Sequence, residues 1–499
     1  MRTPRLLLSA AFAVVLAFPS TSIGQTHPRA WVTTEGDAVF TQMKDDFYSN
    51  PSNPPTMGGK LYAWVKERSD SNGSYFDQGE FGAFLYHVTG DSVYAQRSYN
   101  KLLWYFAVVD CTGLQGNYMR EFYTHVGVYD WIYNGLTPEQ RTTFLNQLNA
   151  QAGCLYAADF VPQDQDQMLG GYFGAAMLYT LTKEYNPTIV NIWETEGVVR
   201  KLGGLTATAA DPSNRRNMIK LYVTDWAAGG EWQQGSQYNE TSLRYLVQGA
   251  NAIKTITGID YFPEITDYLA GAAKMWFQAL WPCSFTSTSQ WNCKPYQWGD
   301  INSDSHSTRY YYWWSTAAVL AGLNQGTPDG GRLQDIITRE IAAVGFPYLN
   351  MTPQFLWNFN PYAAIVDYTT APKTVFSPGM GVFHTRSGWT ADASKLSVRM
   401  PILHAINPNT TYPIKVFDTT YHLTYSANEF QWWVNGTWAI THPLGYLSPN
   451  IDSRGSNSVT IKGMNAWLYS IKEYASLPKW EENETHGFSY ITNTHGGST

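Results

Sequence analysis

The sequence predicts a two-part chain in which a helical domain is followed by an antiparallel β domain. At 499 residues the chain exceeds the ~250–300 residues at which a single core usually stops growing. From about residue 28 to about residue 325, apolar residues recur at spacings of three and four, the pattern of amphipathic helices. Beyond about residue 372 the period changes to two, which is typical of strands. Helices first and strands later favour two segregated domains.

The helical domain is expected to be a series of short-looped helices packed into an array or ring. Turn residues separate its segments, and Thr137, Pro138 and Gln140 form the start signal of one helix: a capping Thr, Pro at the first position and Gln at the third. The clearest helical segments are Phe81–Val88, Val93–Val109, Pro138–Ala152, Gly171–Lys183 and Thr241–Thr257. Residues 326–371 are expected to hold a final helix and a Pro-rich connector.

The β domain is predicted from alternating segments that end in turn dipeptides. Asn435-Gly436 and Lys462-Gly463 are such turns. The strand segments are Leu396–Met400, Glu429–Val434 and Ser458–Ile461.

Residues 1–24 have the composition of a secretory signal peptide. Arg2 and Arg5 precede the apolar run Leu6–Phe18, and small residues lead to an expected cleavage before Gln25. The apolar run is shorter than the ~20 residues of a membrane-spanning helix, which disfavours an anchor. We therefore expect a secreted or periplasmic protein that is free of the membrane after cleavage.

Composition points to carbohydrate rather than nucleic acid. The formal net charge is −7 and the basic residues do not cluster, whereas nucleic-acid binding needs a Lys/Arg stripe. The 20 Trp and 34 Tyr residues exceed what burial alone explains, and aromatic rings stack on the flat faces of sugars.

Four cysteines in an exported chain favour disulfides. Cys283 and Cys293 would close a short loop, which leaves Cys111 and Cys154 for a second bond. Zinc ligation is the competing interpretation, but no CxxC spacing supports it.

Five short motifs in order along the chain resemble the heparinase II/III-like superfamily of polysaccharide lyases, the group that includes alginate lyases and heparinases. The motifs are His27-Pro28-Arg29-Ala30, Thr89-Gly90-Asp91-Ser92-Val93-Tyr94-Ala95, Tyr129-Asp130-Trp131-Ile132-Tyr133 followed by Leu136-Thr137-Pro138-Glu139, Arg386-Ser387-Gly388-Trp389, and Asn428-Glu429-Phe430-Gln431-Trp432.

The resemblance implies an N-terminal (α/α) toroid over residues 25–325, a connector over 326–371 and a C-terminal antiparallel β-sandwich over 372–499. Family sandwiches extend further, so this one is expected to be reduced or incomplete. The implied reaction is β-elimination on uronic-acid polymers. It requires donors that neutralise the substrate carboxylate, a base that removes the C5 proton and an acid that protonates the leaving O4.

Tyr238 is the first candidate catalytic residue, because the Gly-rich stretch from Gly229 to Asn239 resembles the family segment that carries the catalytic Tyr. Glu231 lies upstream in the same stretch and is a candidate substrate-binding residue. The alternative interpretation is an ordinary loop that caps the following helix.

His422 is the second candidate catalytic residue. The run from His422 to Phe430 resembles the family strand that begins with a catalytic His. A His has the intrinsic pKa for proton transfer near neutrality, although a solvent-facing strand His would look the same in sequence.

The zinc site of metal-containing relatives is expected to be lost, so we predict no cofactor. Thr424, Ser426 and Ser456 stand where the family has His, Asp and His, and hydroxyls are poor zinc ligands. His442 is left without evident partner ligands.

Gln167 replaces the Asn of the family's polar cluster and is a candidate donor to the substrate carboxylate. The neighbouring Asp164 and Asp166 would repel that carboxylate, and the run can equally cap the next helix. Arg386, Asp300 and His306 complete the candidate substrate-binding set, with structural salt bridges as the alternative role.

These residues predict a secreted polysaccharide lyase that uses a Tyr/His pair on an anionic polysaccharide. Two alternatives remain open. One is a glycoside hydrolase on the same scaffold, in which two carboxylates stand ~6.5–9.5 Å apart for inversion. The other is a non-catalytic glycan-binding protein with a decayed lyase site.

Overall fold

The computed structural model describes most of the helical half and parts of the β half. The described residues are 27–71, 75–108, 122–157, 174, 177–178, 180–181, 223–224, 227–231, 236–258, 260, 262–285, 310–346, 353–379, 381–399, 429–435, 437–440, 473–482 and 487–495. Within some of these ranges only the backbone is described, and this holds for Tyr238.

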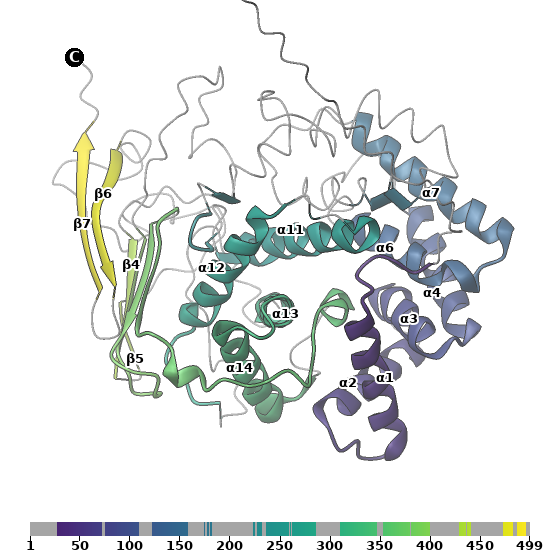
Figure 1. Ribbon diagram of the computed structural model, residues 1–499, viewed down its shortest axis with the longest axis horizontal. Coiled ribbons are helices and arrows are strands. Elements are labelled where there is room, and N and C mark those ends of the chain that lie inside the picture. The colour runs from purple at the N-terminus through teal and green to yellow at the C-terminus, as the bar shows by residue number, and fades with distance from the viewer. Residues whose placement is uncertain are drawn as a thin grey trace, which may run out of the picture.

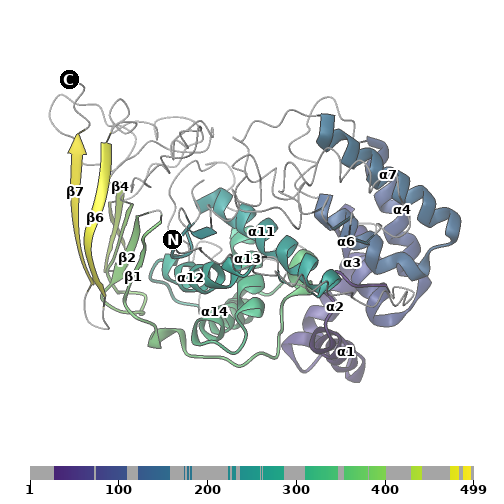
Figure 2. The ribbon, with the colours of Figure 1, turned by 45° about the horizontal axis from the view of Figure 1, so that its top comes forward.

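The described helices fall into an N-terminal group and a central group, and the strands lie beyond the central group (Figures 1 and 2). The N-terminal helices are α1 (Thr34–Ser49), α2 (Met57–Asp70), α3 (Tyr75–Thr89), α4 (Ser92–Val108), α6 (Phe122–Ile132) and α7 (Pro138–Ala157). The central helices are α11 (Ser236–Thr257), α12 (Glu264–Ala279), α13 (Tyr310–Leu323) and α14 (Pro328–Val344). Short 3-10 helices follow at η5 (Pro353–Trp357) and η6 (Tyr368–Thr370), and η1 (Tyr133–Gly135) extends α6.

Threonine caps fix the starts of several helices. Thr33 Oγ1 accepts a hydrogen bond from the Gly36 amide at 3.0 Å, and Thr327 Oγ1 accepts one from the Gly330 amide at 3.1 Å. At α7 the predicted capping box is confirmed: the Gln140 amide donates to Thr137 Oγ1 at 3.2 Å, and the Thr137 amide donates to Gln140 Oε1 at 3.0 Å. Each cap satisfies amide groups that have no partner inside the helix.

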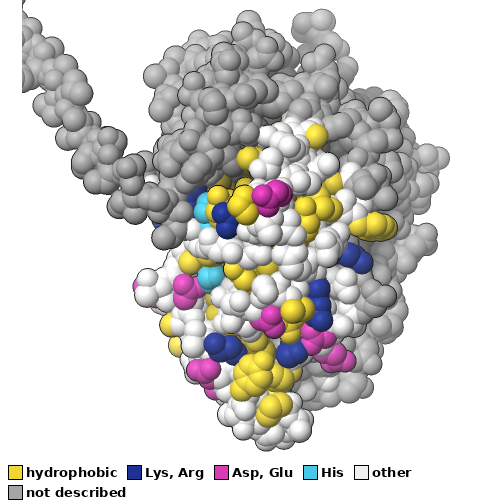
Figure 3. All heavy atoms as spheres, turned by 90° about the vertical axis from the view of Figure 1, so that its right-hand side faces the viewer, with side chains coloured by type: hydrophobic (Ala, Val, Ile, Leu, Met, Phe, Trp, Pro, Cys, Tyr) yellow, Lys and Arg dark blue, Asp and Glu magenta, His cyan; other side chains and the backbone are white. Residues whose placement is uncertain are grey.

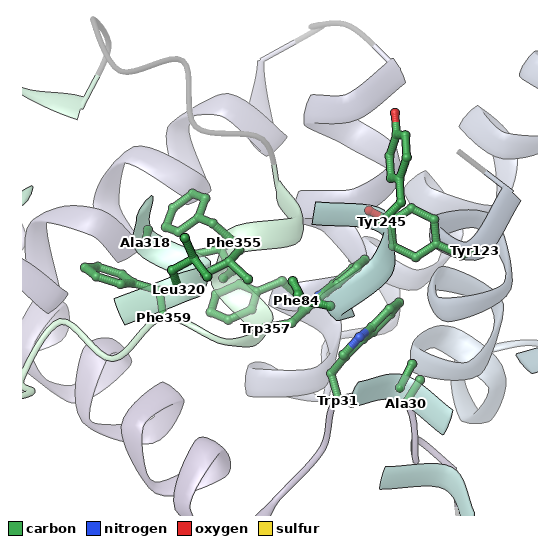
Figure 4. Packing of buried hydrophobic residues seen from close by; sticks show 14 of the residues in the cluster. Ala30, Trp31, Phe84, Tyr123, Tyr245, Ala318, Leu320, Phe355, Trp357 and Phe359 are labelled. Atoms are coloured by element: carbon green, nitrogen blue, oxygen red, sulfur yellow. The ribbon is translucent and has the colours of Figure 1, made fainter. Parts of the chain in front are cut away.

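Aromatic side chains from distant parts of the chain form the helical core (Figure 4). The rings of Trp31 and Trp357 stack with centroids 3.8 Å apart and an interplanar angle of 10°. Trp131 packs against Trp357 with a centroid distance of 5.9 Å. Much of the tryptophan content therefore contributes to burial of apolar surface, which is the main favourable term in folding.

The strands form a five-stranded antiparallel sheet and a separate hairpin. The sheet has the order β1 (Thr374–Ser377), β2 (Val382–Arg386), β3 (Lys395–Arg399), β4 (Glu429–Val434) and β5 (Thr437–Ile440). The hairpin pairs β6 (Glu473–Glu482) with β7 (Gly487–His495). Figure 1 places the hairpin beside the sheet on the side away from the helices.

The two faces of the sheet differ in polarity. Strand residues alternate between faces, and the face that carries Val375 and Trp433 packs on α12 and on Trp281. The same helix-facing side carries the buried polar residues His384, Ser397 and Gln431, which are adjacent in register. Phe376, Phe383 and Val398 lie in register on the opposite face.

The predicted order of helices followed by antiparallel strands is confirmed. Four of the five predicted helical segments correspond to α3, α4, α7 and α11, and described residues of the fifth are helical at positions 174, 177–178 and 180–181. Strands predicted at Leu396–Met400 and Glu429–Val434 correspond to β3 and β4, with Asn435 in a left-handed turn at φ 47°. The strand predicted at Ser458–Ile461 lies outside the described residues.

Surface charges on the N-terminal helices are mixed in sign (Figure 3). Asp70 of α2, for example, pairs with Lys66 and with Arg97, whose Nη1 lies 2.6 Å from Asp70 Oδ1. Among the described helices, none is long and apolar enough to cross a membrane.

Candidate functional site at the junction of helices and sheet

The helices and the five-stranded sheet meet at the C-terminus of α12. Lys395 Nζ donates hydrogen bonds to the carbonyl oxygens of Gln278, Ala279 and Leu280 at 2.7, 2.8 and 3.0 Å. Arg386 Nη2 donates to two of the same carbonyls at 2.8 and 2.7 Å. Two cations from neighbouring strands therefore satisfy the carbonyls that the helix leaves without partners.

A glycine pair next to α12 leads toward α11. Gly229 and Gly230 have φ values of 86° and 99°, a region that favours glycine. A Cβ on Gly230 would lie 2.1 Å from the backbone nitrogen of Ala272, and a Cβ on Gly229 would lie 2.7 Å from Ser377 Cα. Only glycines therefore allow this segment to pass between α12 and β1.

Ser377 of β1 forms hydrogen bonds with the residues on both sides of the glycine pair. Its Oγ donates to the carbonyl oxygen of Ala228 at 2.9 Å and accepts a hydrogen bond from the Glu231 amide at 3.3 Å. The Gly379 amide donates to the same Ala228 carbonyl at 2.9 Å. The segment 227–231 is thereby fixed to the sheet as well as to α12.

Glu231 is buried at this junction, with 5% of its surface exposed. Burial raises the pKa of the Tyr268 hydroxyl well above its usual value, and the negative charge of Glu231 raises it further. Burial lowers the pKa of Lys395 well below its usual value and the charge of Arg386 lowers it again, whereas Glu231 acts in the opposite direction. Glu231 and Lys395 are thus electrostatically coupled across the junction.

Helix α11 follows the glycine segment and carries polar residues into the core. Tyr123 of α6 donates from its hydroxyl to Gln248 Oε1 at 2.8 Å, and its ring meets that of Tyr245 at a centroid distance of 5.5 Å. Position 238 lies in the first turn of α11, seven residues before Tyr245. Seven residues are about two turns, so positions 238 and 245 share one face of the helix.

His125 of α6 is a second buried titratable group in the helical half. Its Nδ1 lies 3.2 Å from Gln151 Oε1, and burial lowers the pKa of His125 to about 4. Burial disfavours the charged imidazolium, so the ring is neutral near pH 7.

The predicted site residues divide into those that the structure describes and those that it does not. Glu231 and Arg386 lie together at the junction. The backbone of Tyr238 belongs to α11, close in sequence to the same segment. His422, Gln167, Asp300 and His306 lie outside the described residues, so their predicted roles stay predictions.

Arg386 makes structural contacts at the junction. It is 6% exposed, its guanidinium stacks over the Trp389 ring at 3.8 Å, and burial lowers its pKa to about 9. The stacking explains why Arg and Trp occur together in the Arg386-Ser387-Gly388-Trp389 motif. Pairing of Arg386 with a substrate carboxylate stays a prediction.

Lys395 and His384 are junction residues that the sequence analysis did not identify. His384 Nδ1 lies 2.8 Å from Ser397 Oγ, and burial lowers the pKa of His384 well below its usual value. The available signal was the period-two pattern of β2 and β3, which places His384, Arg386, Lys395 and Ser397 on one face.

The cysteine and metal predictions are tested only in part. Cys283 is disulfide-bonded, as expected, although its predicted partner Cys293 lies outside the described residues, as do Cys111 and the side chain of Cys154. Within the described ranges no group of three His, Cys, Asp or Glu residues could hold a metal ion. Positions 422, 424, 426, 442 and 456 lie outside those ranges, so the expected loss of zinc stays a prediction.

Comparison with known proteins gives structural similarity without sequence matches. No protein-family model matches the chain, and no curated protein matches it. The structure is similar to a crystal structure of heparinase III, with 15% identity and a TM-score of 0.47 over 92% of this chain and 67% of that one. It is also similar to heparan sulfate lyase HepC from Pedobacter heparinus, with 12% identity and a TM-score of 0.42 over 93% of this chain and 69% of that one.

A further match, to a second heparinase III, has 14% identity and a TM-score of 0.43 over 92% of this chain and 66% of that one. The chain spans about two thirds of the length of the structures that it matches.

Proposed function

We propose that the protein is an exported polysaccharide lyase that cleaves uronic-acid glycans by β-elimination. Tyr238 serves as base or acid, and His422 is its partner in proton transfer. The observation that carries the proposal is the Gly229–Glu231 segment: it is locked between α12 and β1 and is followed, a few residues on, by the helical turn that contains position 238. A fixed entry of this kind suits a residue whose distance from the substrate must be held closely.

The architecture proposed for this activity is an (α/α) toroid joined to a β-sandwich, with the substrate between them. Two observations support it. The helix-facing side of the sheet carries the buried polar row of His384, Ser397 and Gln431, which is unusual for a face that only packs against helices. The apolar row on the other face, which includes Phe376 and Phe383, suits a second sheet that contains the β6–β7 hairpin.

In this proposal the junction supplies Glu231 as a binding group, and Gln167, Asp300 and His306 supply the others. Glu231 accepts a hydrogen bond from a sugar hydroxyl of the substrate. It does not contact the uronate carboxylate, because two negative charges would repel each other. Gln167 donates to the uronate carboxylate, and Asp300 and His306 line the cleft. The substrate is an anionic polysaccharide, and neither nucleic acid nor a metal cofactor takes part.

The test is incubation of the full mature protein with alginate, glucuronan, hyaluronan, heparan sulfate and pectate, followed by ultraviolet absorbance of the 4,5-unsaturated end. Absorbance is expected to rise on at least one uronate polymer. Tyr238→Phe should lower the rate about 10²–10⁴-fold, the range of general acid–base catalysis. Tyr48→Phe is the matched control, because Tyr48 is 55% exposed on α1, away from the sheet. No signal on any of these polymers with a folded protein contradicts the proposal.

A further inference from the structure

Lys395 and Arg386 are direct partners in the register of β2 and β3, and both reach the end of α12. Between them they donate five hydrogen bonds, which go to the carbonyl oxygens of Gln278, Ala279 and Leu280. An ammonium group has three hydrogens, and those of Lys395 are all committed to these three carbonyls. Lys395 is therefore a helix cap and has no donor left for a ligand.

Capping a helix with two neighbouring buried cations costs free energy, because both charges lose their hydration and repel each other. Lys395 is 1% exposed and Arg386 is 6% exposed, and burial lowers the pKa of each side chain. The charge of Arg386 lowers the pKa of Lys395 further. The negative end of the helix dipole and the carboxylate of Glu231 oppose this repulsion. The negative charge of Glu231 thus helps to hold the two cations at the end of α12, and with them the position of α12 on the sheet.

The position of α12 on the sheet determines the position of the glycine segment. Gly271 lies eight residues, or about two turns, before the last residue of α12. A Cβ on Gly271 would lie 2.7 Å from the carbonyl carbon of Gly229, and a Cβ on Gly230 would lie 2.1 Å from the carbonyl carbon of Gly271. Helix and segment are in backbone contact with no side chain between them, so a shift of α12 along the sheet displaces the segment directly.

We propose that Lys395 and Arg386 are positioning residues: they fix α12 on the sheet and, through Gly271, fix the segment that carries Glu231 and leads to Tyr238. This inference deepens the proposed lyase function and rests on it for its kinetic readout only. Its structural readout is independent of any activity.

The structural test is amide hydrogen exchange of the full protein and of three charge-removing variants: Lys395→Met, Arg386→Met and the control Lys373→Met. Lys373 is an exposed residue that directly precedes β1, so its replacement removes the same charge from the edge of the sheet. The amides to follow are those of Gly230, Glu231 and Gly379, which donate to Ala227 O, Ser377 Oγ and Ala228 O. Exchange at these amides should accelerate at least tenfold in Lys395→Met and Arg386→Met, and stay within twofold of wild type in Lys373→Met and throughout α3.

The kinetic test uses the polymer on which the wild-type protein is most active. Lys395→Met should lower kcat at least tenfold and leave KM within threefold, because substrate contacts remain while the reacting geometry is lost. Arg386→Lys retains a charge and donors and should recover at least half of the activity that Arg386→Met loses. If a Met variant does not fold, Arg386→Lys carries the exchange test, with acceleration expected at the same three amides only.

Exchange at Gly230, Glu231 and Gly379 that stays at the wild-type rate in folded Lys395→Met would overturn the inference, whether or not the protein is a lyase. Equal losses of stability and exchange protection across the whole chain, with kcat unchanged, would also overturn it. Absence of turnover in the wild-type protein bears on the lyase proposal alone, because the exchange result is obtained without substrate.

Discussion

His27 and Asp130 join the first described residues of the chain to the buried face of α6. His27 Nδ1 lies 2.5 Å from Asp130 Oδ1, and Asp130 Oδ2 accepts hydrogen bonds from the amides of Arg29 and Ala30 at 2.6 and 2.7 Å. Asp130 is fully buried. The Asp130 carboxylate thus fixes the segment that precedes Trp31, whose ring stacks on that of Trp357.

Asp130→Ala should lower the free energy of unfolding by about 3–5 kcal/mol, because it leaves a buried imidazole, a buried amide and a part-buried amide without their acceptor. Asp130→Asn keeps one acceptor oxygen and should cost less. The surface control is Asp70→Ala, which removes two solvent-exposed ion pairs, with Lys66 and with Arg97, and should change stability by less than about 1 kcal/mol. Denaturant unfolding measures all three variants. Equal effects of Asp130→Ala and Asp70→Ala would contradict the assigned role.

Gly230→Ala should be far more damaging than Gly326→Ala. Both glycines have positive φ, so each substitution costs about 1–2 kcal/mol in backbone strain. Gly326 has open space around its Cβ position, whereas a Cβ on Gly230 would lie 2.1 Å from the backbone of α12. Thermal unfolding and turnover should therefore separate the two variants. Similar behaviour of both would show that the close approach to α12 is not required.

His125 should make the protein less stable as the pH falls from about 6.5 to about 4. Its pKa is about 4 in the folded protein and 6.5 as a free side chain, so only the unfolded state takes up a proton in this window. A shift of this size corresponds to about 3 kcal/mol. His125→Phe removes the titration, and its unfolding free energy relative to wild type should rise as the pH is lowered. A difference that does not change with pH would contradict the buried neutral ring.

Glu340 on α14 should act in the opposite sense. Burial raises its pKa to about 7 from an ordinary value of 4.5, so the folded state retains a proton that the unfolded state releases. Stability from this group is present below pH 4.5 and is lost as the pH rises through 7. Glu340→Gln should therefore stabilise the protein at pH 8 by up to about 3 kcal/mol and change it little at pH 4.5. Glu67→Gln, at an exposed position of α2, is the control.

The helices could be predicted because their signals are local. The apolar spacing of α3, α4 and α11 and the cap at Thr137 lie within a few residues of the elements that they define. The hairpin strand β6 was not predicted, because Pro478 interrupts its pattern. The register of β6 shifts between Ser476 and Lys479, and this irregularity lets the strand accommodate a residue that has no amide hydrogen.

Residues of the candidate site could be predicted only where they belong to a recognisable sequence motif. The glycines before Glu231 were visible in the sequence, and the structure gives the reason for them in the backbone of α12. Lys395 was not predicted, because a charged strand residue ordinarily faces solvent. Its burial depends on carbonyl groups more than a hundred residues earlier in the chain, and no local pattern reports such a contact.

The most direct test of the lyase account is the ratio of unsaturated ends to new reducing ends in the products formed from a uronate polymer. Nuclear magnetic resonance measures the vinyl proton at C4 and the new anomeric protons in one spectrum. β-Elimination creates one unsaturated end for every new reducing end, so the account predicts equal numbers of both. New reducing ends without vinyl protons would contradict it and would identify the protein as a glycoside hydrolase.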